Sequence, residues 1–201
     1  MSHPKFECGE SARTAWRKCI DLPAGASMSD FGRECGGVFL KGGDIVLDDS
    51  ERRRTTVRVE PECKQRWNRE VEVIYTIVRG GEVVKIGGTR NGMQKRWGSY
   101  LCGHCVPERL QRDGSPYPGK MSVTNAHLYH TIESELLETG VKWEFYMWEL
   151  PRTCVEVDIL GERVNVVAQT YHAYESRVME KYRSLTGKIP VLCDNSDPSY
   201  R

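Results

Sequence analysis

The sequence predicts an α+β fold of the α/β sandwich type, in which helices flank a small, central, three-stranded and mainly antiparallel sheet. Its first two strands are expected in a hairpin over residues 71–88, where runs rich in β-branched residues flank Gly80 and Gly81. These glycines can adopt the positive φ angles of a tight hairpin turn. Segment 141–150 supplies the third strand, and helical patterns before and after it supply the flanking layers.

Residues 1–70 are expected to form an N-terminal extension of the main domain, which spans residues 71–201. A short helix is predicted at 11–20, and short strands separated by turn residues follow it. These strands are predicted at 36–40, 42–47 and 55–59. We expect the extension to pack on the main domain or to reach toward a substrate.

Three helices are predicted in the main domain because apolar residues recur three and four positions apart. The first follows Asn91, a good helix cap, and the second ends at Gly140. They are expected at 92–101, 124–139 and 169–185. Two insertions are also predicted, a long irregular loop at 103–119 and a hairpin at 155–167. Loops of this length inside compact domains are usually functional or disordered.

The net charge is only +1, but charge is distributed unevenly along the chain. Residues 51–69 hold seven basic and three acidic residues, and residues 79–112 hold seven basic and two acidic residues. Residues 131–164 reverse the balance, with three basic and eight acidic residues. A basic centre around the first hairpin favours an anionic polymer as the substrate. Ordinary solvated surface charge is the alternative for either basic block alone.

The overall composition is that of a globular protein, with 39% hydrophobic and 28% charged residues. No apolar run approaches the roughly 18 residues that span a bilayer, and the start of the chain lacks the hydrophobic segment of a signal peptide. We therefore predict a soluble, cytoplasmic protein without a membrane partner.

The eight cysteines are mostly far apart, and free thiols are their expected state in a reducing compartment. Only Cys102 and Cys105 are closely spaced. Zinc sites usually need two such ligand pairs, and a second pair is not visible. Free thiols are therefore favoured, and a structural Zn²⁺ at Cys102 and Cys105 is the alternative. Its further ligands would come from His104, His127, His130 or an N-terminal cysteine.

The first hairpin and the helix after it bring together side chains that suit phosphodiester chemistry. Tyr75 lies on the first strand, and Lys85 follows ten residues later on the second. Arg96 and Tyr100 are four residues apart, so they emerge on the same face of the predicted helix. A phenol has a pKa near 10 and needs neighbouring positive charge to ionise, which Lys85 is predicted to supply. The structural alternatives are packing for Tyr75 and surface charge for Lys85 and Arg96.

An acid in the last predicted helix is the remaining candidate. Glu175 lies within roughly 60° of the centre of the apolar stripe, whereas Glu180 lies on the opposite face. An acid at the margin of a buried face must be paired, neutralised or bound to a metal. Magnesium keeps several waters and uses substrate phosphate oxygens, so one carboxylate can suffice. Glu175 is the predicted ligand, and an ion pair with a nearby Arg or Lys is the alternative.

Taken in order, these residues resemble the GIY-YIG nuclease family over residues 71–196. The corresponding elements are Val73-Ile74-Tyr75, Lys85-Ile86-Gly87, Gly88-Thr89, the pair Arg96 and Tyr100, then Glu175 and Asn195. Val73 departs from the family by replacing a glycine, and Lys85 departs from it by replacing the second motif tyrosine. The lysine, together with Tyr100, resembles the branch of type II restriction endonucleases.

The resemblance implies metal-dependent hydrolysis of double-stranded DNA by in-line attack of water. Tyr75 would act as the general base or orient the attacking water, and Arg96 would hold the scissile phosphate. Glu175 would hold Mg²⁺ or Mn²⁺ against the leaving 3′ oxygen. Tyr100 would hydrogen-bond a phosphate oxygen or the water, and Asn195 would position the glutamate helix or the metal shell.

The predicted function is therefore a sequence-specific type II restriction endonuclease that cuts a short palindromic site as a homodimer. Segments 1–70, 103–119 and 155–167 fit elements that such an enzyme adds to its core to read DNA, and the first of them could also serve dimerisation. Within the family, a phage, mobile-element (homing-like) or repair nuclease is the alternative. From another class, the alternative is a catalytically inactive DNA- or zinc-binding module.

Overall fold

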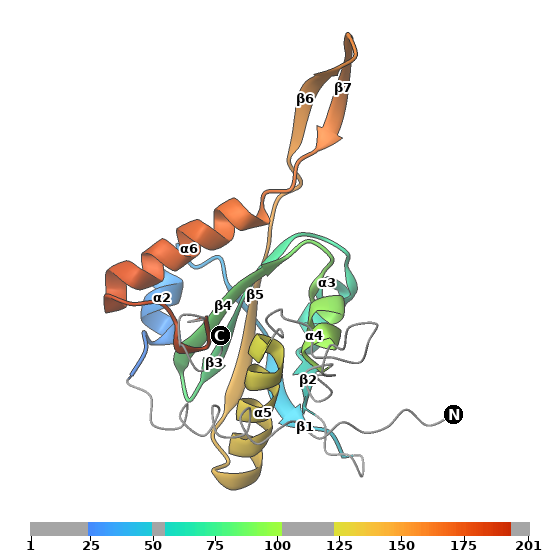
Figure 1. Cartoon of the computed structure of the whole chain (residues 1–201). Helices are drawn as coiled ribbons and strands as arrows, with labels where there is room; N and C mark the ends of the chain where they lie inside the picture. The colour runs from blue at the N-terminus through green and yellow to red at the C-terminus, as the bar shows by residue number, and fades with distance from the viewer. Residues whose placement is uncertain (1–23, 50–54, 102–122, 194–201) are drawn as a thin grey trace, which may run out of the picture.

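A five-stranded antiparallel sheet forms the middle layer of the computed structural model, which describes residues 24–49, 55–101 and 123–193. The strand order is β2-β1-β5-β3-β4, and helices cover both faces of the sheet (Figure 1). The predicted α+β class and the sandwich arrangement are confirmed.

The first predicted hairpin forms the part of the sheet that carries the candidate site. β3 (Val73–Arg79) pairs with β4 (Glu82–Thr89) through a turn in which Gly80 and Gly81 have φ angles of +55° and +89°. β5 (Trp143–Glu149), the predicted third strand, pairs with β3 on the side away from β4. β3 is therefore a central strand, and β4 is an edge strand.

The sheet has two more strands than predicted because part of the N-terminal segment joins it. β1 (Leu40–Leu47) pairs with β5 and with β2 (Thr55–Val59). The prediction of a separate strand at 36–40 is wrong, since Gly36 and Gly37 have positive φ angles in the turn that follows helix α2 (Met28–Glu34). The predicted helix at 11–20 lies outside the described residues, and the domain division at residue 70 stays a prediction.

The three predicted helices of the main domain are confirmed as α4 (Met93–Leu101), α5 (Val123–Glu138) and α6 (Tyr171–Thr186). The short helix α3 (Lys64–Asn68) and the 3₁₀ turn η1 (Pro61–Cys63) were not anticipated from the sequence. Part of the segment after α6 forms a 3₁₀ turn, η3 (Val191–Cys193).

Two hydrophobic cores lie on opposite faces of the sheet. Because side chains alternate along a strand, Tyr75 and Ile77 of β3 enter the core beneath α4 and α5. Ile74 and Val78 enter the core beneath α2 and α6. The alternation therefore decides which helix each side chain of the hairpin can meet.

A second hairpin, formed by β6 (Cys154–Ile159) and β7 (Glu162–Val167), projects from the body of the molecule (Figure 1). It turns at Leu160 and Gly161, which have φ angles of +56° and +87°, and confirms the predicted insertion. The cross-strand register places five aliphatic side chains on one face, which are Val155, Val157, Ile159, Val164 and Val166. Leu160 at its tip is 100% exposed. In the described part of the chain, no helix combines the length and apolar character that a bilayer requires.

Candidate active site

Tyr75 lies directly opposite Gly87 in the β3–β4 register, and its ring covers that glycine. A Cβ atom at position 87 would lie 2.4 Å from the Tyr75 hydroxyl oxygen and 2.5 Å from its Cζ atom. Such distances are far inside van der Waals contact, so the tyrosine can occupy this place only because residue 87 has no side chain.

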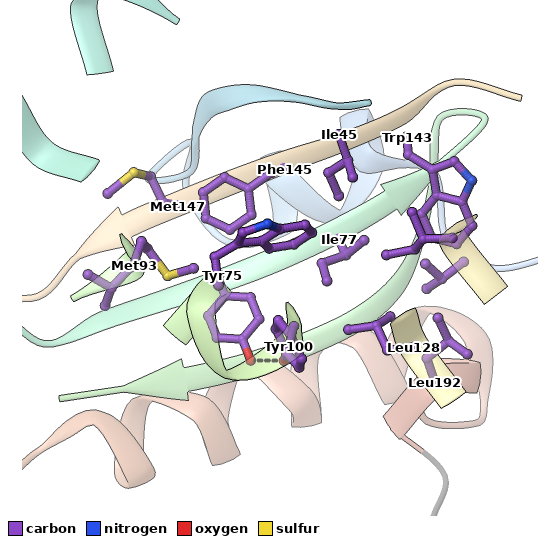
Figure 2. Close-up of a cluster of buried hydrophobic side chains, with 14 residues drawn as sticks. Ile45, Tyr75, Ile77, Met93, Tyr100, Leu128, Trp143, Phe145, Met147 and Leu192 are labelled. Carbon is purple, nitrogen blue, oxygen red and sulfur yellow. Dashed lines mark hydrogen bonds between the residues drawn. The ribbon is translucent and has the colours of Figure 1, made fainter. Parts of the chain in front are cut away.

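The Tyr75 hydroxyl belongs to a buried cluster with Arg96 and Tyr100. The two tyrosines hydrogen-bond each other through their hydroxyl groups (Figure 2). Arg96 Nε donates to the Tyr75 oxygen at 3.0 Å, and its Nη2 donates to the Tyr100 oxygen at 3.1 Å. The guanidinium carbon also lies 4.5 Å from the centre of the Tyr100 ring. The four-residue spacing on α4 thus brings Arg96 and Tyr100 to one tyrosine of β3.

The pKa shifts of Tyr100 and Arg96 indicate that both side chains keep their protons in this cluster. Burial raises the pKa of the Tyr100 hydroxyl well above its usual range, so Tyr100 keeps its proton. Burial lowers the pKa of Arg96, but its contacts with the two phenols outweigh this and raise the pKa above its ordinary value. The Tyr75 oxygen therefore accepts a hydrogen bond from a cation and shares a second hydrogen bond with the hydroxyl of a neutral Tyr100.

Arg96 retains hydrogen-bonding capacity beyond the two tyrosines. A guanidinium has five N–H donors, of which one Nε and one Nη2 proton are used on the phenols. Nη1 lies 3.5 Å from the Ser99 hydroxyl oxygen, at the limit of a hydrogen bond. The half-buried side chain can therefore present donors to an anion and still hold the tyrosine pair.

On the opposite face of β4, the missing side chain of Gly88 leaves room for residues of α6, as that of Gly87 leaves room for Tyr75. A Cβ atom at position 88 would lie 2.6 Å from Cδ2 of Tyr171 and 2.9 Å from Oε2 of Glu175. Both residues belong to α6, which packs against β4. The glycine therefore lets the glutamate approach the backbone of the strand that also supports Tyr75.

Glu175 is half-buried in a place where several positive charges act on it. Burial raises the pKa of its carboxyl group, while Lys85, His172, Arg96 and a backbone hydrogen bond with Gly88 lower it. Among the described residues it has no ion-pair partner, which disfavours the alternative of a simple salt bridge. His172 was not anticipated from the sequence; its position one turn before Glu175 was the only available signal.

Lys85 is buried, and its contacts differ from the predicted one. Its amine donates to the Leu192 carbonyl oxygen at 3.1 Å, whereas the cation in contact with Tyr75 is Arg96. Beside it, the Cys193 thiol accepts from the Ile86 amide at 3.2 Å and donates to the Ile86 carbonyl at 3.1 Å. The turn η3 thus covers part of the outer edge of β4, and the charge of Lys85 lowers the pKa of Glu175.

Some predicted residues cannot be compared with the structure. Asn195, Cys102 and Cys105 lie outside the described residues, as does the 103–119 loop, so their roles stay predictions. Four described cysteines are free thiols, namely Cys35, Cys63, Cys154 and Cys193. Within 24–49, 55–101 and 123–193, no three His, Cys, Asp or Glu side chains converge on a common metal position. A metal at this site would therefore rely on Glu175 together with water and substrate oxygens.

No protein-family model and no curated protein matches this chain. Two solved structures are similar to it in fold at low identity. One is restriction endonuclease HPY188I in complex with product DNA, with 19% identity over 96% of this chain and 100% of the other, and a TM-score of 0.48. The other is a mutant of bacteriophage T4 EndoII, with 20% identity over 84% of this chain and 100% of the other, and a TM-score of 0.49.

Gly87→Ala should destabilise the protein because the new methyl group collides with the Tyr75 ring. Overpacking of this kind costs about 1–3 kcal/mol, measurable by urea denaturation. The matched control is Gly98→Ala on α4, where a Cβ atom meets nothing within 4 Å. Alanine favours a helix over glycine, so this variant should gain about 0.5–1 kcal/mol. Equal stability of Gly87→Ala and wild type would contradict the described packing of Tyr75.

Proposed function

We propose that this protein is a metal-dependent DNA endonuclease of the GIY-YIG type, and that it acts as a sequence-specific type II restriction endonuclease. One observation carries the proposal: Gly87 and Gly88 at the end of β4 admit a Tyr75–Arg96–Tyr100 cluster on one face and Glu175 on the other. A phenol, a guanidinium and a half-buried carboxylate around one strand end are suited to hydrolysis of a phosphodiester.

In the proposed reaction, Tyr75 acts on the attacking water and Glu175 acts on the leaving side of the phosphate. Tyr75 takes a proton from the attacking water or orients it, and its hydroxyl is hydrogen-bonded to that of Tyr100. Arg96 uses its remaining N–H groups to hold the scissile phosphate and to stabilise the charge that develops on it. Tyr75 is 0% exposed, so the residues around its hydroxyl must move to let the attacking water reach it.

Glu175 fits the role of a magnesium ligand because it is a half-buried carboxylate that has no ion-pair partner among the described residues. Burial raises its pKa, and Lys85 opposes that rise and so favours the charged form that a divalent cation requires. A bound Mg²⁺ or Mn²⁺ would stabilise negative charge on the leaving 3′ oxygen. Lys85 therefore acts on Glu175, in addition to its bond with the Leu192 carbonyl.

The proposed homodimer is supported by the hairpin formed by β6 and β7. Val155, Ile159 and the fully exposed Leu160 are exposed apolar residues of the hairpin. Among its charged residues, Glu156, Asp158 and Glu162 outnumber Arg163. The net negative charge disfavours contact with DNA phosphates. An enzyme that cuts a palindromic site needs two-fold symmetry, so a second copy of this chain is the proposed occupant of the hairpin.

Glu175→Gln and Tyr75→Phe should each abolish most of the magnesium-dependent cleavage of duplex DNA. Loss of a general base or of a metal ligand typically costs about 10²-fold or more in rate, measurable in single-turnover assays. The matched controls are Glu180→Gln, on the exposed face of α6, and Tyr174→Phe, whose ring stays packed on Trp148. Both controls should cleave at near the wild-type rate.

The same assay distinguishes the candidate functions. A long defined DNA cut into discrete fragments supports a restriction enzyme, whereas smearing or junction-dependent nicking supports a phage, mobile-element or repair nuclease. Absence of cleavage with either Mg²⁺ or Mn²⁺ would contradict the proposed chemistry and favour the inactive DNA- or zinc-binding module.

The double variant Ile159→Ser, Leu160→Ser should convert a dimer into a monomer because it removes apolar contacts at the hairpin tip. Light scattering should then give the mass of one chain, where the wild type gives twice that mass. Leu185→Ser is the control, since Leu185 on α6 is 44% exposed, close to the 49% of Ile159. A wild-type protein that is monomeric, or a dimer that survives the hairpin substitutions, would contradict this role of the hairpin.

A further inference from the structure

A pocket of about 450 Å³ lies where the second hairpin leaves the body of the protein. Segments that precede or follow β3, β4, β5 and β7 form its wall. Arg90 in this wall comes two residues after Gly88, and Gln169 comes two residues before Tyr171, which packs against Gly88. The pocket therefore lies at the end of β4 and before the start of α6, the two elements whose contact brings Glu175 to Gly88.

The two glutamates of this pocket have partners within the protein, whereas its two arginines have no ion-pair partner among the described residues. The carboxylate of Glu72 accepts hydrogen bonds from the backbone amides of Thr170 and Tyr171 at the start of α6. Glu70 pairs with Lys95 at 2.7 Å. Arg90 and Arg152 are both exposed, and neither has an ion-pair partner among the described residues. The pocket therefore offers two available guanidinium groups.

The rest of the pocket wall is largely apolar, which favours a ligand that has an apolar part as well as an anionic group. The apolar part of the wall consists of Val71, Leu150, Pro151, Val167 and Ala168. Asn91 and Gln169 add amide groups that can donate hydrogen bonds. A ligand with a ring that can lie on apolar surface and a flanking anionic group matches this combination. The volume is in the range of clefts that hold small organic groups.

We propose that this pocket anchors the DNA backbone beside the scissile bond, by receiving a deoxyribose and the phosphates that flank it. Arg90 and Arg152 each neutralise one phosphate, and the apolar wall contacts the sugar ring. The inference rests on the proposed function because it names a substrate contact of the same site. It assigns the two arginines to binding, so neither is needed for the chemical step.

DNA binding by the Glu175→Gln protein, measured as a function of salt, tests this proposal without cleavage. Arg90→Ala and Arg152→Ala should each weaken binding several-fold and reduce the slope of log K against log salt by about 0.9, the value for one phosphate contact in B-DNA. Arg33→Ala is the matched control, since Arg33 is an exposed arginine on α2, near the other end of β4. Slopes equal to that of the control would overturn the proposal.

A second measurement changes the DNA and compares the Glu175→Gln protein with and without Arg90→Ala, so that loss of one phosphate charge can be matched to loss of one arginine. Phosphates on either side of the cleavage position are replaced singly by neutral methylphosphonates. At one position, the substitution should weaken binding as much as Arg90→Ala does, and it should have no further effect on the Arg90→Ala variant. Fully additive effects at every position would contradict the assigned contact.

The two proposals fail in different ways. If the wild type cuts no DNA but Arg90→Ala still lowers the salt slope, the nuclease function is wrong and the backbone anchor stands. If the wild type cuts DNA and the arginine variants bind like Arg33→Ala, the anchor is wrong and the nuclease stands. Competition of a free mononucleotide with DNA, relieved by Arg90→Ala, would identify a nucleotide site instead and would overturn the anchor.

Discussion

Two consecutive residues without side chains at the end of an edge strand are the constraint on which the candidate site depends. Successive residues of a strand face opposite sides of the sheet, so Gly87 opens one face of β4 and Gly88 opens the other. The first opening admits the Tyr75 ring, and the second admits Glu175 on α6. A side chain at either position would separate the phenol from the carboxylate.

The buried polar groups around this strand satisfy one another, which is what makes their burial tolerable. The Tyr75 oxygen accepts a hydrogen bond from Arg96 and shares another with the Tyr100 hydroxyl. Lys85, which would be costly to bury alone, is bonded to the Leu192 carbonyl. Glu175 is less completely satisfied, since burial raises its pKa against the influence of nearby cations. In the proposed reaction, a bound divalent cation would offset the cost of burying this charge.

Local sequence patterns predicted most of the fold and the pairing of Arg96 with Tyr100 on one helix face. The glycine pair of the turn, the helical spacing and the four-residue step from Arg96 to Tyr100 are short-range signals, and each was confirmed in geometry. Pairings between distant segments were not predictable, because nothing local specifies that β1 adds to β5 or that η3 meets Lys85. For the same reason, the cation in contact with Tyr75 came from α4 and not from the paired strand.

In the proposed reaction, Tyr75 and Glu175 act on opposite sides of one phosphate. The most direct test is single-turnover cleavage of DNA in which the bridging 3′ oxygen at the cut position is replaced by sulfur, a better leaving group. The Glu175→Gln defect should then shrink by about tenfold or more, because the leaving atom no longer needs stabilisation, while the Tyr75→Phe defect should persist. Equal rescue of both variants, or rescue of Tyr75→Phe alone, would show that Glu175 does not act on the leaving oxygen as proposed.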